Sequence, residues 1–487
     1  MSRKFLILWV FSACALVWLY FHIGRDSVPF FVSPQNWKTP FSSGDTGAQP
    51  PDLPHENHDT GNGLVEVLPE APVLVTGQNE GPSDKEHSPM PTLSTQTQTH
   101  DSVATSTPIA PEQPGLSIAL IESAETHDEV TAALVYAFAS QKDSALTIYS
   151  ARLRYGSEKI IKEFNLPISI NNTKNFKKAV RESPPPPILI STTCELDLPR
   201  LSDTLDILLA GGKTYLFCVV HHADRWTKSD SANVVRPWIE KEMVDFITLS
   251  AHTAQFLQTE IAKWDYNVTV PVQVLPPVFP INLPKPLDDS DHENKFSLAM
   301  QGDYDASRRD YKGIFRDLSE VVESARNGSE GEKNTPLEVA LHLIGHGNRP
   351  PVPENVKEQT VFDENLSYID FYTILSQSFA LLPAFASNEY FDRKASSTVP
   401  ASIIGGVPLV ASEELLRAYS YLPRDAAWIS QPNEGEMDVI KRVRNMKDER
   451  AKKRGIIQVA CQNIVKENIE HASEWINNSL KRINYVS

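Results

Sequence analysis

The chain has 487 residues, too many for one hydrophobic core and enough for about three units of ordinary domain size. It carries 62 acidic and 46 basic residues, a formal net charge of −16, so it shows no basic excess of the kind that binds nucleic acid. Its four cysteines exclude a disulfide-rich scaffold, and no Cys-x-x-Cys or His-Glu-x-x-His spacing indicates a metal site.

An apolar segment lies close to the N-terminus. Residues 5–23 are free of charged side chains over 19 positions, close to the roughly 20 that cross the hydrocarbon layer. Two basic residues precede this segment and no net charge follows it, which places the tail 1–4 in the cytosol. A cleaved signal peptide would end its apolar core at a small-residue site, whereas here apolar residues continue beyond Ala15. We therefore expect an uncleaved type II signal-anchor helix at 5–23.

The next segment, 24–115, is expected to be a disordered stalk. Residues 26–115 hold 14 of the 36 prolines and 12 acidic against 2 basic residues, without a periodic apolar pattern. The Ser-, Thr- and Pro-rich stretch at 88–107 is typical of O-glycosylated stalks. The anchor and stalk together place the globular part in the lumen of the Golgi or the ER. Glycosylation sequons agree with this location and occur at Asn171, Asn267, Asn327, Asn365 and Asn477.

From residue 116 the sequence alternates between strand and helix patterns. Apolar or β-branched runs predict strands at 117–121, 145–150, 188–193, 214–220 and 244–249. The clearest helix, 128–140, begins at a capping-box sequence that runs from Thr126 to Glu129. Strands that alternate with helices predict a parallel sheet covered on both faces, and hence a Rossmann-like acceptor domain at 116–275.

Three cysteines lie outside the apolar span. Cys194 and Cys218 end or lie within predicted strands and could pair, but we favour buried free thiols. Cys461 lies in the C-terminal tail.

A Pro-rich stretch at 270–287 has no helix potential and is interpreted as a linker. A second alternating set follows, with strands at 295–301, 337–345, 360–362, 379–383 and 407–411, helices at 311–325, 368–377 and about 398–405, and a mainly helical tail at 436–483. We expect a second Rossmann-like domain at 276–487. Ligands of such sheets bind at the carboxyl ends of strands, beside helix N-termini.

The segment 366–411 has the most specific pattern. A buried strand ends at Pro383, and a helix then leads to Gly406-Val407-Pro408 and an apolar run up to Ala411. This order resembles the donor domain of glycosyltransferases with the two-Rossmann-domain GT-B fold, particularly retaining family 4 enzymes and fungal type II membrane relatives. The resemblance implies a hexosyltransferase whose donor is a nucleotide-sugar, and it favours retention of configuration while leaving inversion open.

Two groups of residues are candidates for donor binding. Phosphate groups favour backbone N–H groups at a helix N-terminus together with a cation. The start of the predicted helix 398–405 offers both, through Lys394, Ser396, Ser397 and Thr398. An ordinary helix cap beside a surface lysine would have the same sequence and is the alternative interpretation. The resemblance also points to a second donor site in the segment after strand 295–301, at Gly302, Arg308, Arg309 and Lys312. A solvated basic turn is the alternative interpretation of this segment. The sequence does not decide which of the two arginines faces the ligand.

One feature departs from the family pattern. Family 4 enzymes usually carry two glutamates separated by seven residues, and the second binds ribose. Aligned on Gly406, these positions are Arg393 and Ala401, and Glu389 is the nearest acid that could substitute after a loop shift. The segment Asp303–Asp305 also matches the Asp-x-Asp metal motif of the other glycosyltransferase fold, but two predicted α/β halves argue against that fold, so no metal is expected.

Three histidines are candidates for catalysis. His221 and His222 directly follow the predicted strand 214–220, and His127 lies in the first turn of the helix after strand 117–121. A histidine with a pKa near neutral can deprotonate an acceptor hydroxyl or bind a donor phosphate, although structural histidines are the commoner case. Weaker candidates for a base are Glu122, Glu125 and Asp224.

The sequence therefore predicts a membrane-anchored glycosyltransferase that moves a sugar from a nucleotide-sugar to a lumenal glycan or glycoprotein. It needs no cofactor beyond the donor substrate. A non-catalytic glycan-binding protein derived from a lapsed glycosyltransferase is the alternative, because Ala401 replaces the usual glutamate. A serine hydrolase is excluded, since no Gly-x-Ser-x-Gly elbow occurs.

Overall fold

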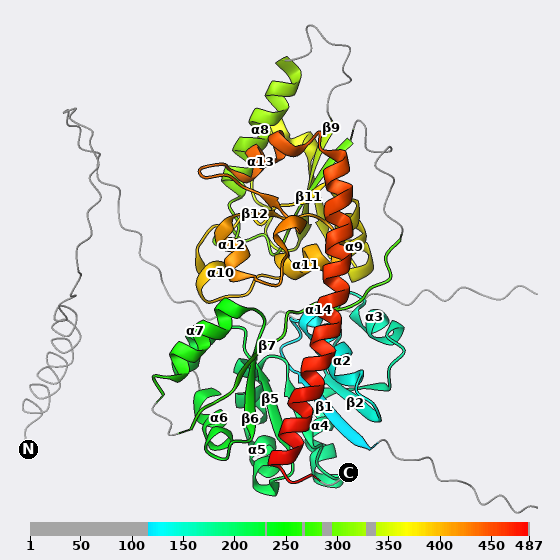
Figure 1. Cartoon of the computed structure of the whole chain (residues 1–487), viewed down its shortest axis with the longest axis vertical. Coiled ribbons are helices and arrows are strands. Elements are labelled where there is room, and N and C mark those ends of the chain that lie inside the picture. The colour runs from blue at the N-terminus through cyan, green and yellow to red at the C-terminus, as the bar shows by residue number, and fades with distance from the viewer. Residues whose placement is uncertain (1–114, 229–230, 265–267, 285–294, 328–337, 486–487) are drawn as a thin grey trace, which may run out of the picture. The chain divides into compact units, whose positions relative to one another are not determined.

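The structure, a computed structural model, describes residues 115–487 except 229–230, 265–267, 285–294, 328–337 and 486–487 (Figure 1). The expected cytosolic tail, the signal-anchor helix 5–23 and the stalk up to residue 114 lie outside the described residues. Among the helices that are described, none combines the length and the apolar character that crossing a bilayer requires.

The first half is a seven-stranded parallel sheet in the order β3-β2-β1-β4-β5-β6-β7. Its strands are β1 (Leu116–Glu122), β2 (Ser144–Ser150), β3 (Ile168–Asn171), β4 (Ile188–Ser191), β5 (Tyr215–Val219), β6 (Val244–Thr248) and β7 (Val272–Val274). Its helices are α2 (Asp128–Ala139), α3 (Ser157–Glu163), α4 (Thr173–Glu182), α5 (Cys194–Gly211), η1 (Ala223–Lys228), α6 (Ser231–Glu240) and α7 (Ala251–Ile261). The central strands β4, β5 and β6 are buried at every position, as parallel strands covered on both faces must be.

The five predicted strands are confirmed, whereas the sequence patterns do not predict the edge strands β3 and β7. Strand β7 lies inside the Pro-rich stretch that the sequence predicts to be a linker. Its neighbour Pro271 accepts a hydrogen bond from Phe246 through its carbonyl oxygen at 2.9 Å. Proline is tolerated there because an edge strand needs only one row of hydrogen bonds.

The capping box expected at the start of α2 does not form. His127 is the N-cap and makes no side-chain capping bond. Asp128 instead accepts hydrogen bonds from the backbone N–H of Arg154 and from Ser157 Oγ, at 3.3 and 3.2 Å. The acidic residue of the expected box, Glu129, likewise accepts a hydrogen bond from a distant residue, Tyr368, at 3.0 Å.

The second half contains a four-stranded parallel sheet in the order β10-β9-β8-β11 and a parallel pair β12-β13. The strands are β8 (Lys295–Gln301), β9 (Glu338–Gly345), β10 (Thr360–Glu364), β11 (Ala380–Leu381), β12 (Val410–Ala411) and β13 (Trp428–Ile429). The helices are α8 (Tyr311–Asn327), η4 (Glu354–Gln359), α9 (Tyr368–Gln377), α10 (Glu389–Asp392), α11 (Thr398–Gly405), α12 (Glu413–Ala418), η5 (Arg424–Ala426), α13 (Glu436–Val443) and α14 (Lys447–Arg482). The predicted elements of this half are present, with shorter strands at β11 and β12.

The last helix, α14, contacts both halves (Figure 1). Its first part packs against η5 and α11, and its last part packs against α2 and β4. Near its C-terminal end the ring of Trp475 lies 6.5 Å from the rings of both Phe138 and Phe217 in the first half. The final segment of the chain therefore completes the hydrophobic core of the first half.

The expectation of free thiols at Cys194 and Cys218 is wrong, because these residues form a disulfide with their Cα atoms 5.4 Å apart. Cys194 begins α5 directly after β4, and Cys218 lies on β5, which pairs with β4. The sheet order thus brings together two cysteines that are 24 residues apart in sequence.

Replacing Cys194 and Cys218 together by alanine should lower the free energy of unfolding by about 3 kcal/mol, because the disulfide restricts the unfolded chain. Urea denaturation of the full-length protein in detergent would measure this loss. Cys461→Ala is the matched control, since it removes a thiol that is not bonded. Equal losses in the two variants would mean that the disulfide adds nothing.

Candidate functional site

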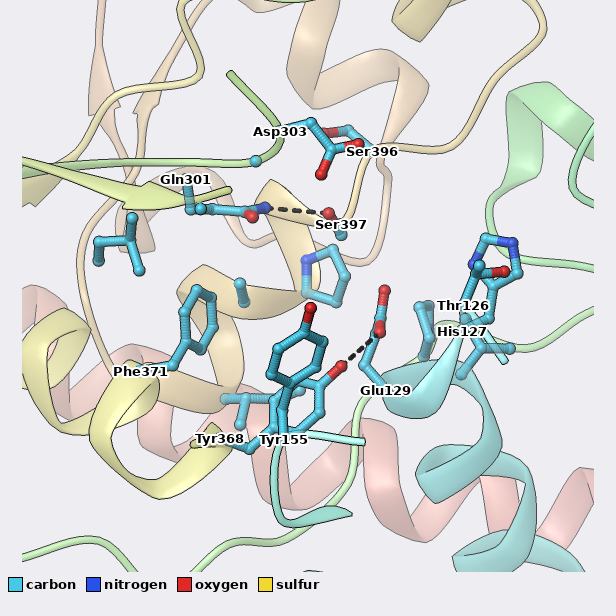
Figure 2. A pocket seen from close by; sticks show the side chains of 18 of the residues that line it. Thr126, His127, Glu129, Tyr155, Gln301, Asp303, Tyr368, Phe371, Ser396 and Ser397 are labelled. Carbon is cyan, nitrogen blue, oxygen red and sulfur yellow. Dashed lines mark hydrogen bonds between the residues drawn. The ribbon is translucent and has the colours of Figure 1, made fainter. Parts of the chain in front are cut away.

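A cavity of about 450 Å³ is lined by residues of both halves (Figure 2). The first half contributes the start of α2, the loop after β2 and the residue after β5. The second half contributes the ends of β8 and β9, the loop between β10 and α9, and the start of α11. The cavity therefore lies at the carboxyl ends of parallel strands, where ligands of open α/β sheets bind.

The start of α11 forms one wall of the cavity. Gln301, the last residue of β8, donates through Nε2 to Ser397 Oγ and to Thr398 Oγ1, both at 3.0 Å. The backbone N–H of Thr398 binds Ser396 Oγ at 3.2 Å. Ser396 and Ser397 border the cavity, while Thr398 is buried behind them. The positive end of the α11 dipole therefore borders the cavity.

The two arginines after β8 have different environments. Arg309 is 4% exposed; its Nε donates to the Gln301 carbonyl at 3.1 Å, and its Nη2 donates to Thr398 Oγ1 at 2.9 Å. Gly302 has a φ of +129°, and an added Cβ would lie 3.0 Å from Arg309 Nη2, so this position requires glycine. Arg309 thus fixes the end of β8 to α11. Arg308, whose side chain is 48% exposed, is the arginine with charge accessible to a ligand.

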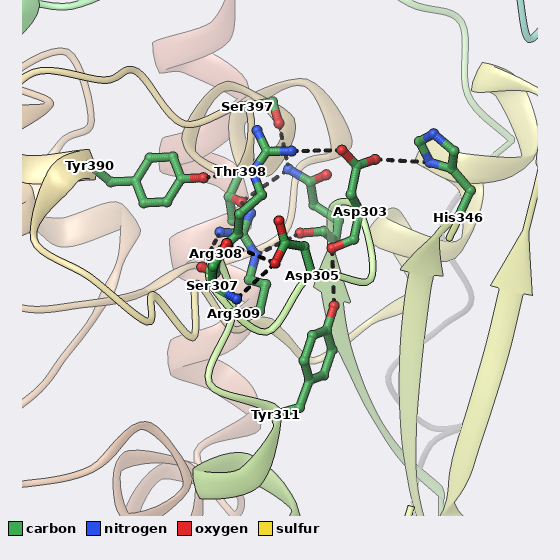
Figure 3. A network of polar contacts seen from close by, with 11 residues as sticks. Asp303, Asp305, Ser307, Arg308, Arg309, Tyr311, His346, Tyr390, Ser397 and Thr398 are labelled. Carbon is green, nitrogen blue, oxygen red and sulfur yellow. Dashed lines mark hydrogen bonds and ion pairs between the residues drawn. The ribbon is translucent and has the colours of Figure 1, made fainter. Parts of the chain in front are cut away.

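Arg308 belongs to a chain of charged groups on the cavity wall (Figure 3). Its Nη1 lies 2.6 Å from Asp303 Oδ2, and its Nε donates to Tyr390 Oη at 3.1 Å. The other oxygen of Asp303 lies 3.0 Å from His346 Nδ1. An anionic ligand would therefore compete with Asp303 for Arg308.

The Asp-x-Asp pattern does not converge on one point. Asp303 faces Arg308 and His346, whereas Asp305 accepts hydrogen bonds from the backbone N–H and the hydroxyl of Ser307, at 2.8 and 2.7 Å. Within the described residues, no group of three or more His, Cys, Asp or Glu side chains could hold a metal ion.

Besides Thr398, three of the candidate donor-binding residues do not border the cavity. Lys312 is exposed in the first turn of α8. Lys394 and Glu389 form an ion pair with each other, with Nζ 2.6 Å from Oε2. Glu389 also pairs with Arg393. The lysine charge is therefore already compensated by a neighbouring carboxylate.

Two of the three candidate histidines meet at the cavity. The rings of His127 and His221 are stacked, with centroids 3.8 Å apart. Burial and the neighbouring His221 lower the pKa of His127 well below its ordinary value, so we expect this imidazole to be neutral at pH 7. His222 does not border the cavity, and burial lowers its pKa to about 4. The backbone N–H groups of His221 and His222 both donate to Glu195 Oε1, at 2.7 and 2.6 Å, which fixes the end of β5.

Ala401 also borders the cavity, where the family pattern has a ribose-binding glutamate. It is 4% exposed, and its neighbours Pro400 and Ile404 line the same wall. This wall therefore presents apolar groups instead of a carboxylate.

Several lining residues were not among the candidates from sequence. They are Glu129, Tyr155, Gln301, His346, Tyr368 and Tyr390. Glu129 Oε2 accepts a hydrogen bond from Tyr368 Oη at 3.0 Å, across 239 residues of sequence. Their position in the predicted elements could have identified two of them as site residues. Gln301 ends a strand, and Glu129 lies in the first turn of a helix that follows a strand.

The sequons differ in their surroundings. Asn171 and Asn477 are exposed, and Asn365 is exposed at the edge of the cavity. The side chains of Asn267 and Asn327 are outside the described part of the chain.

Comparison with solved structures identifies the fold. Two structures of an alpha-glucosyltransferase match, one in complex with UDP-glucose and DNA containing an abasic site and one in complex with UDP and a 13-mer DNA containing an HMU base. Each has a TM-score of 0.50 and covers 74% of this chain and 99% of its own, at 11% and 12% sequence identity respectively. Anabaena HepE in complex with UDP and glucose matches with a TM-score of 0.45 at 13% identity, over 75% of this chain and 99% of HepE.

No family model matches the sequence, and no curated protein matches it. The chain has the fold of the alpha-glucosyltransferase, the GT-B arrangement of two Rossmann-like halves.

The loop that leads from β1 to the cavity is held by a buried carboxyl group. Glu122 Oε1 accepts from the backbone N–H groups of Ala124 and Glu125, both at 2.8 Å, and Oε2 accepts from Thr193 Oγ1 at 3.0 Å. Burial, and next the charge of Asp197, raise the pKa of Glu122 from 4.5 to about 7. The native protein therefore binds a proton here that the unfolded chain releases near pH 4.5.

Glu122→Gln should change how stability depends on pH. In the wild type, the raised pKa of Glu122 makes the free energy of unfolding fall as the pH rises from about 4.5 to 7, at up to about 1.4 kcal/mol per pH unit. The variant lacks this titration, so it should gain stability relative to the wild type across that window, by up to about 3 kcal/mol. Urea denaturation at pH 5, 6, 7 and 8 would measure the difference. Glu163→Gln, at an exposed position in α3, is the control; the same pH profile in both variants would contradict the proposed titration.

Proposed function

We propose that this protein is a glycosyltransferase that moves a sugar from a nucleotide-sugar donor to a glycan or glycoprotein acceptor. The observation that carries the proposal is the shared cavity, which has Arg308 and the start of α11 on one wall and the His127–His221 pair on another. Phosphate groups favour a helix N-terminus together with a cation. The alpha-glucosyltransferase of similar fold, solved with UDP-glucose, supports a nucleotide-sugar donor.

In this proposal, Arg308 exchanges Asp303 for the donor diphosphate, and Ser396 and Ser397 bind the phosphate oxygens. His127 and His221 are the proposed groups that accept a proton from an acceptor hydroxyl, since an uncharged imidazole has a free nitrogen lone pair. Closure of the two halves would exclude water from the activated sugar. Retention of configuration in a hexosyl transfer rests on the resemblance of segment 366–411 alone.

We also propose a lumenal location in the Golgi or the ER, behind a type II anchor at 5–23. The Cys194–Cys218 disulfide supports it, because disulfides persist in oxidising compartments. The exposed sequons agree with it. The alternative of a non-catalytic glycan-binding protein is favoured by one observation, the missing carboxylate at Ala401.

A nucleotide panel tests the proposed function directly. Full-length protein in detergent should gain about 2.7 kcal/mol of stability from its donor at 100 times Kd, which thermal shift would detect. Transfer of radiolabelled sugar from the same donor would separate an enzyme from a lapsed one. If no nucleotide or nucleotide-sugar stabilises the protein, the proposal is wrong.

Arg308→Ala should weaken binding of a nucleoside diphosphate by about 1.5–3 kcal/mol, because a charge-assisted hydrogen bond is lost. Binding of the bare nucleoside should change little, since it has no phosphate. Isothermal titration with UDP and uridine, or with GDP and guanosine, would measure both.

Arg424→Ala is the matched control, because Arg424 also pairs with a carboxylate, Glu413, but does not border the cavity. Lys394→Ala should weaken binding less than Arg308→Ala does, since Lys394 does not border the cavity. Equal weakening of the nucleoside and its diphosphate by Arg308→Ala would exclude this residue from the phosphate site.

A further inference from the structure

Glu129 is the carboxylate that the roles proposed above leave unused. It is the second residue of α2 and borders the cavity. Figure 2 shows its side chain extending from α2 into the cavity beside Tyr155 and Tyr368. Tyr368 belongs to α9 in the second half, so its hydrogen bond to Glu129 connects the two halves at the cavity.

The two acidic residues at the start of α2 differ in how the protein uses them. Asp128 is buried and accepts two hydrogen bonds, from Arg154 and Ser157. Glu129 accepts one from another residue, Tyr368, and its own backbone N–H also donates to the carboxylate. Burial raises the pKa of Glu129. Figure 2 shows the oxygen that does not meet Tyr368 directed into the cavity.

The chemistry of this oxygen limits what it can bind. A carboxylate repels phosphate groups, so Glu129 is unsuited to the diphosphate that Arg308 and α11 would take. A metal ion would need further ligands, and the described residues contain no cluster that provides them. Hydroxyl groups fit, because they donate short, charge-assisted hydrogen bonds to carboxylates. Tyr155, beside Glu129, offers an aromatic face for the apolar side of a sugar ring.

We propose that Glu129 binds a sugar hydroxyl in the cavity and thereby determines which sugar is accepted. Tyr368 is a positioning residue, since its hydroxyl holds one carboxylate oxygen and leaves the other directed to the ligand. The hydroxyl belongs either to the sugar of the nucleotide-sugar or to the acceptor glycan. This inference rests on the proposed glycosyltransferase function and adds the residue that recognises the sugar.

The test is the selectivity of Glu129→Gln, which keeps the size of the side chain and removes its charge. Calorimetry on the full-length protein would give Kd for UDP, UDP-glucose, GDP and GDP-mannose. Titration with methyl glycosides of glucose, galactose and mannose, with UDP or GDP present, would give Kd for free sugars. If Glu129 binds the donor sugar, Kd should rise about tenfold or more for the nucleotide-sugar and less than about twofold for its nucleoside diphosphate. If it binds the acceptor, the rise should appear for a methyl glycoside only.

Tyr368→Phe keeps the ring and removes the hydroxyl, so it should shift the same sugar-bearing ligand by a smaller factor. Its effect should disappear in a Glu129→Gln background, because it acts through that carboxylate. A purely structural hydrogen bond would instead lower the thermal midpoint and weaken every ligand equally.

Glu414→Gln is the matched control, because Glu414 is also the second residue of a helix, α12, but is exposed and outside the cavity. An unchanged Kd for every sugar-bearing ligand in Glu129→Gln would overturn the inference, as would equal losses for a nucleoside diphosphate and its sugar conjugate. Failure of the wild type to bind any nucleotide would instead overturn the proposed function itself. The two failures are therefore distinguishable.

Discussion

Among the described residues, every pair of neighbouring strands is parallel. Parallel neighbours cannot be joined by a tight turn, so the chain returns through a crossover each time and all carboxyl ends of a sheet collect along one edge. The loops that follow β1, β5, β8 and β9 therefore meet at one place although they are distant in sequence. The candidate site is a direct consequence of this pairing rule, and the side chains only give it chemical character.

That character comes from uneven compensation of charge. Arg309 is fully engaged between Gln301 and Thr398 and serves as a structural cation. Arg308 forms an ion pair with Asp303 at the surface of the cavity, where an anion that binds more strongly could replace Asp303. Burial lowers the pKa of both stacked histidines, and the neighbouring His221 lowers that of His127 further. The cavity therefore has Arg308 on one wall and, on the other, Arg154, two imidazoles and the carboxyl group of Glu129.

The sequence predicts those features that depend on local pattern. Apolar runs located β1 and β8, and the bounds of α11 follow from the residues before it and Gly406 after it. The sequence patterns do not predict contacts between residues that are far apart in the chain. The bond between Glu129 and Tyr368, and the burial of Arg309 next to an exposed Arg308, depend on how separate elements pack. No periodicity encodes such packing. The edge strands and the disulfide were not predicted for a related reason, because both depend on the order of strands in the sheet.

The contact between α14 and the first half has a consequence for biosynthesis. Trp475 lies against Phe138 and Phe217, and both phenylalanines are buried in the finished protein. The helix that covers them is translated on the order of tens of seconds after the first half, at ~5–20 residues per second. During that interval the nascent first half exposes an aromatic surface. A premature stop before Trp475 would therefore remove part of the core that Phe138 and Phe217 share with it.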